Sequence, residues 1–583
     1  MKKPILKRLI RYMKPYLPIL TGAFVSAVIN VLLTLYGPIL VGHAIDQILG
    51  AGKVDFEALL PILVQLLLTV VGSALFQWVQ AYCTNKSAYE TVRDLRIQTY
   101  RKINTLPLSY IDAHSHGDII SRLVNDVDQV SDGLLQGTTQ FFTGIVTILG
   151  TLLFMLSISP AIALAVVLIT PLSIFVAAMI ARLCHKQFIR QQAAQGELTG
   201  FVEEHISGQK IVKTFAFEKR AQETFEAING RLYESGVKAQ FYSSLSNPST
   251  RFVNNLVYAA VAILGSVCVI TGMPAALTVG QVQSFLAYAN QYTKPFNDVT
   301  AVITQIQTAF ASARRLFDFL DEAEETSDSP AAAVLHGAAG QVDVNNLGFS
   351  YSKESRLIEN LSFHAEPGSH IAIVGPTGCG KTTIINLLMR FYDADRGTIL
   401  IDGKDVRTVT RASLRGVFGL VLQDSWLFSG TVRENIAYGR PNASLEQVTA
   451  AAKAAHVHSF IMRLPQGYDT VIREDGSNFS QGQRQLLCIA RVMLVDPPIF
   501  ILDEATSSID TRTEVHIQHA FDRMIQGRTS FIVAHRLSTI QNADCILVMN
   551  QGHIVEQGTH TELLRKNGFY AKLYKSQFAG AQI

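Results

Sequence analysis

The stretch HIAIVGPTGCGKTT, from His370 to Thr383, decides the fold of the second half of the chain. Its apolar start predicts a buried strand, the glycine-rich segment predicts a tight loop, and the apolar run IINLLMRF that follows predicts a helix. The order G-x-x-x-x-G-K-T is typical of a phosphate-binding loop, because glycines let backbone N–H groups approach phosphates and the helix dipole adds positive potential. We expect Lys381 to reach the β- and γ-phosphates and Thr382 to reach magnesium.

The candidate phosphate loop comprises Gly375, Pro376, Thr377, Gly378, Cys379, Gly380, Lys381, Thr382 and Thr383. The alternative is a glycine turn with a purely structural role. Such a turn would have little use for Gly380, Lys381 and Thr382 in that order. We expect Cys379 to be a bystander inside the loop.

Two further apolar strands end in polar residues. PPIFILDEA, Pro497–Ala505, ends in two acids, of which Asp503 suits magnesium binding and Glu504 suits a base that polarises water. FIVAHR, Phe531–Arg536, ends in His535, which would face the γ-phosphate. Adjacent acids also occur on surface turns, and a lone histidine after a strand is more often structural. Because the three residues accompany a phosphate loop, we favour a functional role for them over a structural one.

NFSQGQRQ, Asn478–Gln485, is polar and leads into the apolar run LLCIARVML, which has helical character. A polar segment in this position predicts a helix N-terminus. Free backbone N–H groups there offer a site to an anion.

Long runs without Asp, Glu, Lys or Arg fill the first half of the chain. They are Tyr16–Ile45, Ala58–Asn85, Gly133–Ala181 and Phe252–Thr293. A span needs about 20 apolar residues, so we expect the last two runs to be split, at Ser157–Pro160 and at Gly272–Pro274. Six membrane-spanning helices result; buried helices of a soluble protein are the alternative that runs of this length disfavour.

Lysine and arginine in the flanks predict the orientation. Six basic residues precede the first run, whereas the segment Asp46–Glu57 contains only Lys53. We therefore expect both termini in the cytoplasm. The charged connections Lys86–Asp132 and Lys186–Arg251 predict helices that continue the spans and turn at Pro107–Asp118 and Ile206–Arg220.

The expected walls of the helical bundle carry mostly amides and hydroxyls, including Asn30, Gln77, Gln80, Gln140 and Gln291. Such walls suit a lipophilic or amphipathic small molecule and membrane lipid, and they suit an inorganic ion poorly. The nearby charged residues are Arg251, Lys294 and Asp298. Anchoring at the membrane interface is the interpretation we favour for them over a functional role.

Composition excludes some classes. The net charge of +3 and the lack of a basic stripe argue against a nucleic-acid partner. The six scattered cysteines fit a reducing compartment. No cleavage site for a signal peptide follows the basic N-terminus.

An acidic, then Ala/Gly-rich segment predicts a linker at 321–340 between a transmembrane domain, 1–320, and an α/β domain, 341–583.

The order GPTGCGKTT, VLQDSWLFSGTVRENI, NFSQGQRQ, IFILDEATSSID, IVAHR resembles the nucleotide-binding domain of an ABC transporter. With six spans before it, the whole chain resembles an ABC exporter half-transporter of the multidrug, lipid or peptide type. The resemblance implies an α-helical transmembrane bundle with long cytoplasmic extensions, followed by an α/β P-loop ATPase domain. It also implies ATP and Mg²⁺ as cofactors and a second half-transporter as partner.

The resemblance assigns roles by position. Tyr351 matches the aromatic residue that stacks on adenine, and Gln423 matches the loop glutamine that contacts magnesium and water. The turns at Pro107–Asp118 and Ile206–Arg220 match the family's coupling helices. NFSQGQRQ stands where the family has its signature. In the family, the helix that begins at the signature binds the γ-phosphate held by the opposite domain. The donors there would come from Ser480, Gly482 and Gln483.

The signature departs from L-S-G-G-Q at its third position, where Gln481 replaces glycine. Glycine permits backbone angles and a close approach that glutamine does not. Because Lys381, Asp503, Glu504 and His535 are all present, we favour one half of a heterodimer with unequal sites. A homodimer that tolerates Gln481 is the alternative.

The leading function is therefore ATP-driven export or flipping of lipophilic or amphipathic compounds by alternating access. An importer of the siderophore type shares the architecture, and an ATP-gated channel or regulator is a third possibility. We expect an integral protein of a bacterial inner membrane, with the ATPase domain in the cytoplasm.

Overall fold

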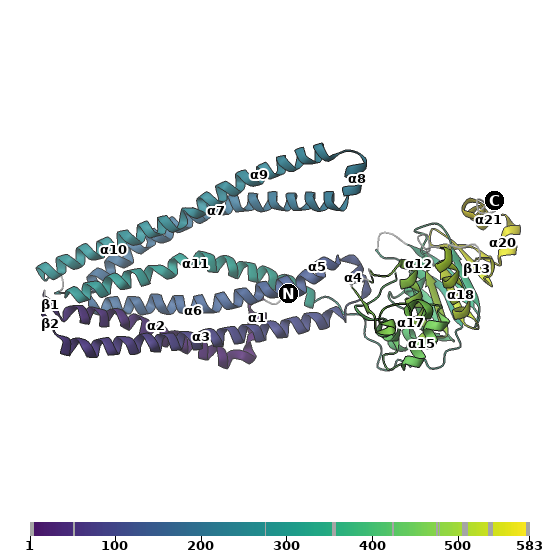
Figure 1. Ribbon diagram of the computed structural model, residues 1–583, viewed down its shortest axis with the longest axis horizontal. Coiled ribbons are helices and arrows are strands. Elements are labelled where there is room, and N and C mark those ends of the chain that lie inside the picture. Colours follow the sequence, from purple (N-terminus) through teal and green to yellow (C-terminus); the bar gives the residue numbers. More distant parts are fainter. Residues whose placement is uncertain are drawn as a thin grey trace. The chain divides into compact units, whose positions relative to one another are not determined.

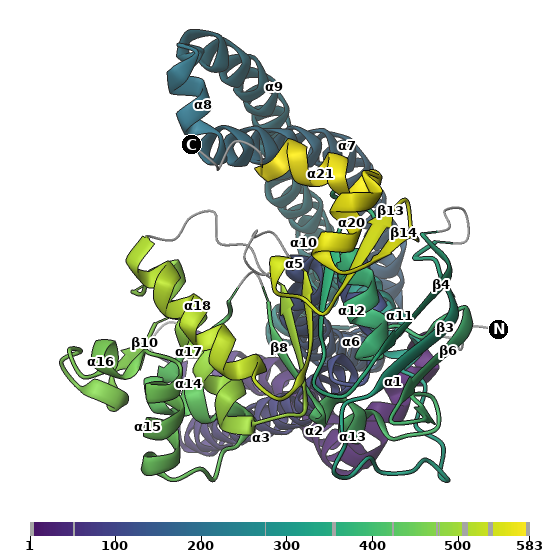
Figure 2. The ribbon, with the colours of Figure 1, turned by 90° about the vertical axis from the view of Figure 1, so that its right-hand side faces the viewer.

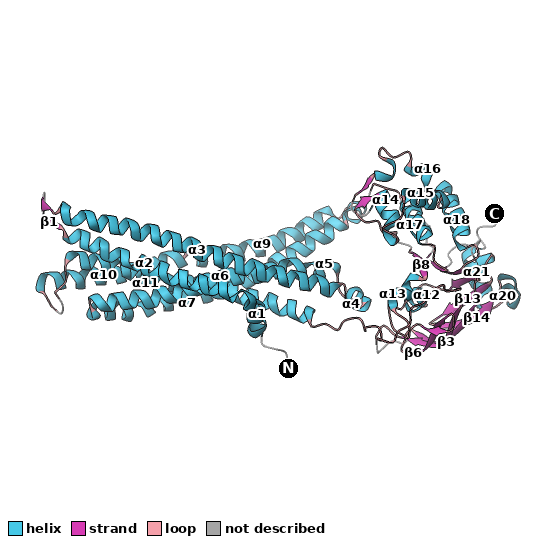
Figure 3. Cartoon of the chain, turned by 90° about the horizontal axis from the view of Figure 1, so that it is seen from below, coloured by secondary structure: helices cyan, strands magenta, loops and turns pink. Residues whose placement is uncertain are grey.

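The computed structural model describes residues 5–50, 53–273, 276–352, 357–422, 425–473, 476, 478–503, 511–533 and 540–578. The chain divides into two compact units, which are described separately. The first comprises Met1–Thr105 and His114–Glu322, and the second comprises Leu106–Ala113 and Ala323–Ile583. The first unit is almost entirely helical, whereas the second contains most of the strands (Figure 3).

Long helices make up the first unit (Figure 1). Their bounds are α1 Ile5–Met13, α2 Leu17–Asp46, α3 Phe56–Ile103, α5 His116–Ser121, α6 Val127–Ile158, α7 Pro160–Ser207, α8 Gln209–Thr214, α9 Glu218–Ser244, α10 Ser246–Thr271 and α11 Val279–Leu320. A short antiparallel pair, β1 Ile48–Gly50 and β2 Lys53–Val54, lies between α2 and α3 in the chain.

Both predicted helix breaks are confirmed. Ser159 has extended angles, φ −154° and ψ 108°, and Pro160 begins α7, where its missing N–H leaves no helical hydrogen bond unmade. Gly272 ends α10 with φ +69°, in the left-handed region that glycine adopts readily. Long helices consequently stand at each of the six predicted positions, as α2, α3, α6, α7, α10 and α11.

Four helical stretches of the described residues are long and apolar enough to cross a membrane. They are Ile5–Asp46, Phe56–Ile103, His116–Ile158 and Glu218–Thr271. A shorter apolar stretch, Pro160–Leu172, begins α7. The predicted helical bundle is thus confirmed in its architecture.

Helices α7, α8 and α9 form an arm that extends away from the other helices of the first unit (Figure 1). α7 packs against α9 and α10, and α8 lies at the tip of the arm. Apolar side chains are exposed at this tip, since Ile206, Ile211 and Phe215 have 71%, 65% and 74% of their surface accessible. An exposed apolar cluster of this kind is typical of a surface that binds another molecule.

Helices α2 and α11 meet backbone to backbone at one end of the first unit. A Cβ atom on Gly280 would lie 2.0 Å from the carbonyl oxygen of Gly42, so no larger residue fits. The Asp46 carboxylate accepts hydrogen bonds from the Thr278 hydroxyl at 2.7 Å and from the Gly280 N–H at 2.8 Å. It therefore caps the first turn of α11, where the helix dipole favours a negative charge.

A six-stranded sheet forms the centre of the second unit, in the order β14-β13-β5-β12-β11-β8. The strands are β5 His370–Val374, β8 Phe418–Val421, β11 Ile499–Asp503, β12 Thr529–Val533, β13 Cys545–Asn550 and β14 His553–Gly558. All are parallel except β14, which pairs antiparallel with β13. Parallel strands are covered on both faces, which explains why β5, β11 and β12 are continuous apolar runs.

A second, antiparallel sheet has the order β4-β3-β6-β7. Its strands are β3 Val342–Phe349, β4 Ile358–Ala365, β6 Arg396–Ile401 and β7 Lys404–Asp405, and a small separate pair is β9 Gly430–Thr431 with β10 Val471–Ile472. The helices of this unit are α4 Leu108–Ala113, α12 Lys381–Leu388, α13 Arg411–Gly416, α14 Val432–Ile436, α15 Leu445–Ala454, α16 His458–Ile461, α17 Gln481–Val495, α18 Thr511–Ile525, α20 His560–Lys566 and α21 Phe569–Phe578.

Helices cover both faces of the six-stranded sheet (Figure 2). Alternate residues of β11 serve two cores: Ile499 and Ile501 belong to the core that contains α12, whereas Phe500 and Leu502 belong to the core that contains α17 and α18. The carboxyl ends of parallel strands share one edge of a sheet, and ligands of α/β proteins bind there. The fold therefore brings the ends of β5, β11 and β12 to one place.

Candidate nucleotide-binding site

The predicted strand, loop and helix are present as β5, residues 375–380 and α12. Gly378 and Gly380 have φ values of +82° and +101°, which residues with a Cβ atom rarely adopt. A Cβ atom on Gly375 would lie 2.3 Å from the carbonyl oxygen of Met549 on the neighbouring β13. The loop thus requires glycine, and it ends at the N-terminus of α12, where free N–H groups favour an anion.

Lys381 begins α12 and turns its ammonium group back over the loop. Nζ donates hydrogen bonds to the carbonyl oxygens of Gly375 and Pro376, both at 2.9 Å. The cation is therefore held close to the loop that is predicted to hold phosphate. In the same first turn, Thr382 is exposed and Thr383 is buried.

Tyr351 lies beside α12 in a cluster of three aromatic rings. The rings of Phe349 and Tyr392 lie 4.8 Å and 5.1 Å from it, both edge to face. Its hydroxyl donates to Oγ1 of Thr383 at 3.3 Å and accepts from the Asn386 amide at 3.4 Å. Since 51% of Tyr351 is exposed, the fixed ring has room to stack on a flat ligand.

Asp503 ends β11 at the same edge of the sheet. It pairs with Val533 of β12, and Val533 pairs with Ile373 of β5. Two strand spacings of about 4.8 Å place the end of β11 roughly 10 Å from the end of β5. Carboxylate and hydroxyl oxygens are ligands that magnesium prefers, so the Asp503 and Thr382 side chains fit this ion.

Three predicted catalytic residues, Gln423, Glu504 and His535, lie outside the described residues. In the chain, Glu504 follows Asp503 directly, and His535 comes two residues after the end of β12.

The predicted helix N-terminus in NFSQGQRQ is confirmed as the start of α17. Ser480 is its N-cap: Oγ accepts from the Gln483 N–H at 3.3 Å, while Gln483 Oε1 accepts from the Ser480 N–H at 2.9 Å. This capping box leaves the Ser480 hydroxyl hydrogen available to a further acceptor. Gly482 is buried in the first turn.

Gln481 is the first residue of α17 and so has right-handed helical backbone angles. These angles do not require glycine. From the sequence, glycine is expected at position 481 for its backbone angles and for the close approach of a ligand. The helix removes the first reason, and the second remains. The neighbouring Phe479 is buried and packs against Phe460 at 5.7 Å between ring centroids.

Two family models match the chain. One, described as ABC transporter transmembrane region, matches residues 20–296, and the other, described as ABC transporter, matches residues 358–507. An uncharacterized ABC transporter ATP-binding protein of Bacillus subtilis, YfiC, is 42% identical over 576 residues, which cover 99% of this chain and 94% of that protein. The chain belongs to the ABC transporter family.

Other proteins that resemble this ABC transporter have more specific names. A fatty acid ABC transporter ATP-binding/permease protein of Mycobacterium bovis is 44% identical over 523 residues, covering 90% of this chain and 82% of that protein. An ATP-dependent lipid A-core flippase of Syntrophus aciditrophicus is 35% identical over 574 residues, covering 98% and 94%. The structure of a bacterial Atm1-family ABC exporter with ATP bound matches with a TM-score of 0.77, 30% identity and coverage of 96% and 98%.

These findings confirm the resemblance on which the sequence analysis relied. This ABC transporter is an integral membrane half-transporter of the exporter type, with the transmembrane and ATPase domains in one chain. It binds nucleotide and couples ATP hydrolysis to transport.

Cys379 is buried in the phosphate loop of the transporter, with 4% of its surface accessible. Its Sγ lies 4.0 Å from Lys381 Nζ. Burial raises the pKa of the Cys379 thiol above its usual value, although the Lys381 charge acts in the opposite direction. A bystander role is consistent with a thiol in this state.

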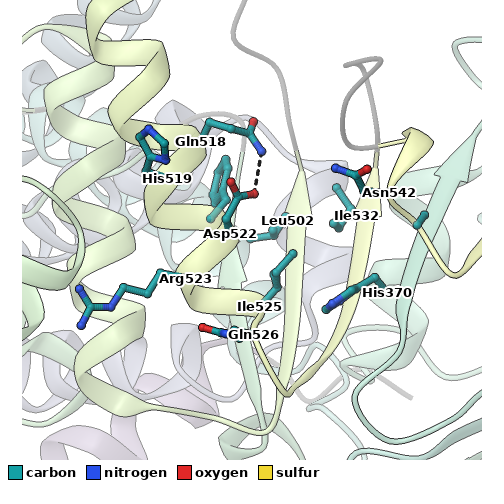
Figure 4. A pocket seen from close by; sticks show the side chains of 12 residues that line it. His370, Leu502, Gln518, His519, Asp522, Arg523, Ile525, Gln526, Ile532 and Asn542 are labelled. Carbon is teal, nitrogen blue, oxygen red and sulfur yellow. Dashed lines mark hydrogen bonds between the residues drawn. The ribbon is translucent and has the colours of Figure 1, made fainter.

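A cavity of about 550 Å³ in the second unit lies between α18 and the strands of the central sheet (Figure 4). Its walls include Leu502, Ile532, His519 and the pair Gln518–Asp522, whose side chains are joined by a 3.0 Å hydrogen bond. None of its described lining residues belongs to the phosphate loop.

Sequence reasoning missed three contributors to the site, namely Asn386, Tyr392 and the Met549 carbonyl group. Asn386 and Tyr392 fix the Tyr351 ring, and Met549 limits the space at Gly375. Tyr392 follows α12 in an unremarkable polar segment, and a backbone carbonyl has no sequence signal. The motif alone pointed to none of the three.

Proposed function

We propose that this chain is one subunit of a dimeric exporter or flippase that moves lipophilic or amphipathic compounds by alternating access. The observation that supports the substrate class is a cavity of about 780 Å³ in the first unit, between α2, α3, α6 and α11. Apart from Lys294, its described walls are apolar side chains together with neutral amides and hydroxyls. Such a lining suits a ligand that is largely hydrocarbon, and it matches the lipid-related names of two relatives.

In the proposed ATP site, the loop 375–380 and Lys381 hold the phosphates and Tyr351 stacks on adenine. Thr382, Asp503 and Gln423 hold Mg²⁺, which when bound neutralises phosphate charge. Glu504 polarises the attacking water, and His535 faces the γ-phosphate. The geometry that supports these roles is the glycine-dependent loop, the Lys381 position and the shared edge of β5, β11 and β12.

The proposal requires two subunits, because the donors of α17 serve the nucleotide of the opposite chain. Ser480, Gly482 and Gln483 supply these donors, and the position of Ser480 at the start of α17, with its hydroxyl hydrogen not used by the capping box, supports that role. The exposed tip of the arm, with Ile206, Ile211 and Phe215, supplies a second surface for the partner. Apolar residues exposed on the second unit, such as Trp426 at 58%, are suited to receive it.

We favour a heterodimer over a homodimer. Gln481 begins α17, where its side chain adds bulk beside the free N–H groups that would bind the partner's γ-phosphate. The site completed by this chain's α17 would then turn over slowly, and the partner's signature would complete the site that contains Glu504. Brisk ATPase activity of this chain purified alone would contradict the heterodimer proposal.

We also propose a bacterial inner membrane as the location, with both termini in the cytoplasm. The basic N-terminal flank supports this orientation, and the relatives named above are bacterial.

Transport in proteoliposomes tests the proposed function. The full-length chain, with any subunit that copurifies, is reconstituted with fluorescent lipids and lipophilic dyes, and ATP-dependent movement is measured. The Glu504→Gln variant should bind ATP but nearly stop both hydrolysis and transport. ATP-independent movement that is equal in the two proteins would overturn the proposal.

A further inference from the structure

The cavity of the first unit contains a cation. Lys294 of α11 lines it, and among the described lining residues Lys294 alone carries a charge. The sequence interpretation favoured an interface anchor for this residue. Its position in the cavity wall supports the functional alternative instead.

The other polar groups of the wall are neutral and several are already engaged. The Gln80 amide donates to the Thr143 hydroxyl at 2.9 Å, and Asn30 Oδ1 accepts from Ser73 at 3.0 Å. Gln291 differs, because its Oε1 is buried without a hydrogen-bond partner. Since Gln291 precedes Lys294 by three residues on α11, the two side chains share one face of the helix.

The depth of Lys294 places the charge toward the cytoplasmic side. It lies 15 residues after Val279, where α11 begins, which corresponds to about 23 Å along the helix axis. In the proposed orientation α11 starts at the external side, so Lys294 is well inside the inner half of a hydrocarbon core of about 30 Å. Apolar residues such as Val31, Leu35 and Ile148 line other parts of the cavity.

A lysine in an apolar membrane cavity requires a counter-charge, because an uncompensated ammonium group is costly to desolvate. The described part of the wall offers no carboxylate, so an anionic group on the ligand is suited to supply this charge. We propose that Lys294 is the headgroup subsite of the cavity and that it selects amphipathic substrates with a single anionic head, a carboxylate or a phosphate. The Gln291 side-chain N–H₂ group, not its Oε1, is the donor suited to the same head, and the apolar walls hold the hydrocarbon chain.

This inference rests on the proposed function, because it takes the cavity to be the transport cavity. It goes further by naming the charge of the substrate and the residue that binds the charged headgroup. A headgroup held at this depth has its chain toward the membrane centre. That is the arrangement of a lipid taken from the inner leaflet.

A headgroup series with one hydrocarbon chain tests the inference. Oleate, oleyl phosphate, oleyl alcohol and oleylamine compete with a fluorescent fatty acid for the full-length protein in nanodiscs. We expect the anions to bind about tenfold or more tightly than the alcohol, and oleylamine to bind weakest. The stronger of the two anions identifies the source as carboxylate or phosphate.

Variants at Lys294 test whether this residue causes the preference for anionic headgroups. Lys294→Gln should remove the preference for an anion without weakening oleyl alcohol binding, and Lys294→Arg should retain it. The matched control is Lys186→Gln, an exposed lysine on α7, which should behave as the parent protein. The headgroup series of the unmodified protein needs no variant, so the absence of an anion preference would overturn the inference even if Lys294→Gln fails to fold.

Equal binding of oleate and oleyl alcohol, or an anion preference that survives Lys294→Gln, would overturn the inference. If the inference fails but ATP still drives neutral lipophiles across the membrane, the proposed function stands without the headgroup subsite. If ATP drives none of the compounds, the proposed function itself fails.

Discussion

The Tyr392 hydroxyl donates a 2.5 Å hydrogen bond to Oδ2 of Asp112, a residue 280 positions earlier in the chain. Asp112 belongs to α4, the short helix at the first predicted cytoplasmic turn, and the Tyr392 ring contacts Tyr351. Burial raises the pKa of the Tyr392 phenol, and the Asp112 bond raises it further. The phenol therefore remains a donor throughout the physiological pH range, and it links the proposed adenine site to α4.

The Tyr392→Phe substitution should remove this hydrogen bond and keep the ring contacts with Phe349 and Tyr351. A partly exposed bond to a carboxylate contributes about 1 kcal/mol, so the effect of substrate on ATPase rate should fall by up to about fivefold. Basal hydrolysis should change little. ATPase rates with and without a transported lipid measure both quantities.

The variant Asp112→Asn serves as its control, because the amide oxygen can still accept from Tyr392. A Tyr392→Phe protein with full substrate stimulation would show that the bond is structural only.

Two substitutions at Ser480 separate helix capping from anion binding. Ser480→Ala should lose the cap, which costs about 1 kcal/mol of stability, together with the hydroxyl donor. Ser480→Asp should keep the cap, because aspartate is a good N-cap residue, but its negative charge would repel a phosphate. Thermal unfolding and the ATP affinity of the assembled dimer should thus respond differently in the two variants.

If Ser480→Asp binds ATP as tightly as the parent protein in the assembled dimer, the hydroxyl does not face a nucleotide. Parent-like ATP affinity in both variants, with unequal stability, would assign Ser480 a capping role alone.

Cys379 should react slowly with alkylating reagents in the folded protein. Burial limits access, and the raised pKa lowers the fraction of reactive thiolate at neutral pH. Mass spectrometry of the Cys379 peptide after timed alkylation, with and without ATP, checks this expectation. Rapid labelling that ATP prevents would instead show that the loop opens and exposes the thiol.

His364 should make a stabilising contribution that depends on pH. Its Nδ1 lies 2.5 Å from Asp343 and its Nε2 lies 2.9 Å from Glu366, and these contacts raise the pKa of the imidazole, with Glu366 the larger cause. A raised histidine pKa stabilises the folded state fully below the unfolded value of about 6.5, and this stabilisation is lost as the pH rises through the folded-state pKa. Because the group is largely exposed, the contribution should be less than about 1 kcal/mol.

Melting temperatures of the parent protein and of His364→Gln, measured across a pH series, test this. The difference between them should be largest in mild acid and should shrink in alkali. A difference that grows with pH would contradict the assignment.

The sequence predicted best those features that depend on neighbouring residues. Charge-free runs located the helices, Pro160 and Gly272 located the breaks, and the polar stretch Asn478–Gln485 located the start of α17. Each depends on the backbone preferences of a few consecutive residues, or on the cost of placing charge in lipid.

Features that depend on distant parts of the chain could not be predicted. Whether Lys294 faces the cavity is decided by how α11 rotates against α2, α3 and α6. Cys379 is buried because its loop packs beside β13, which lies far along the sequence. Glycine was expected at position 481 partly because of its backbone angles. Only the structure of α17 showed that Gln481 adopts the angles this position needs.

The contact of Gly42 with Gly280, together with the Asp46 cap, has a consequence for the transport cycle. Pulling α2 and α11 apart at this end would break both hydrogen bonds of the Asp46 carboxylate and the backbone contact of Gly42 with Gly280. These two ends accordingly travel as a single rigid body. In the proposed orientation, any widening of the external mouth has to come from displacement of the remaining helices relative to this pair.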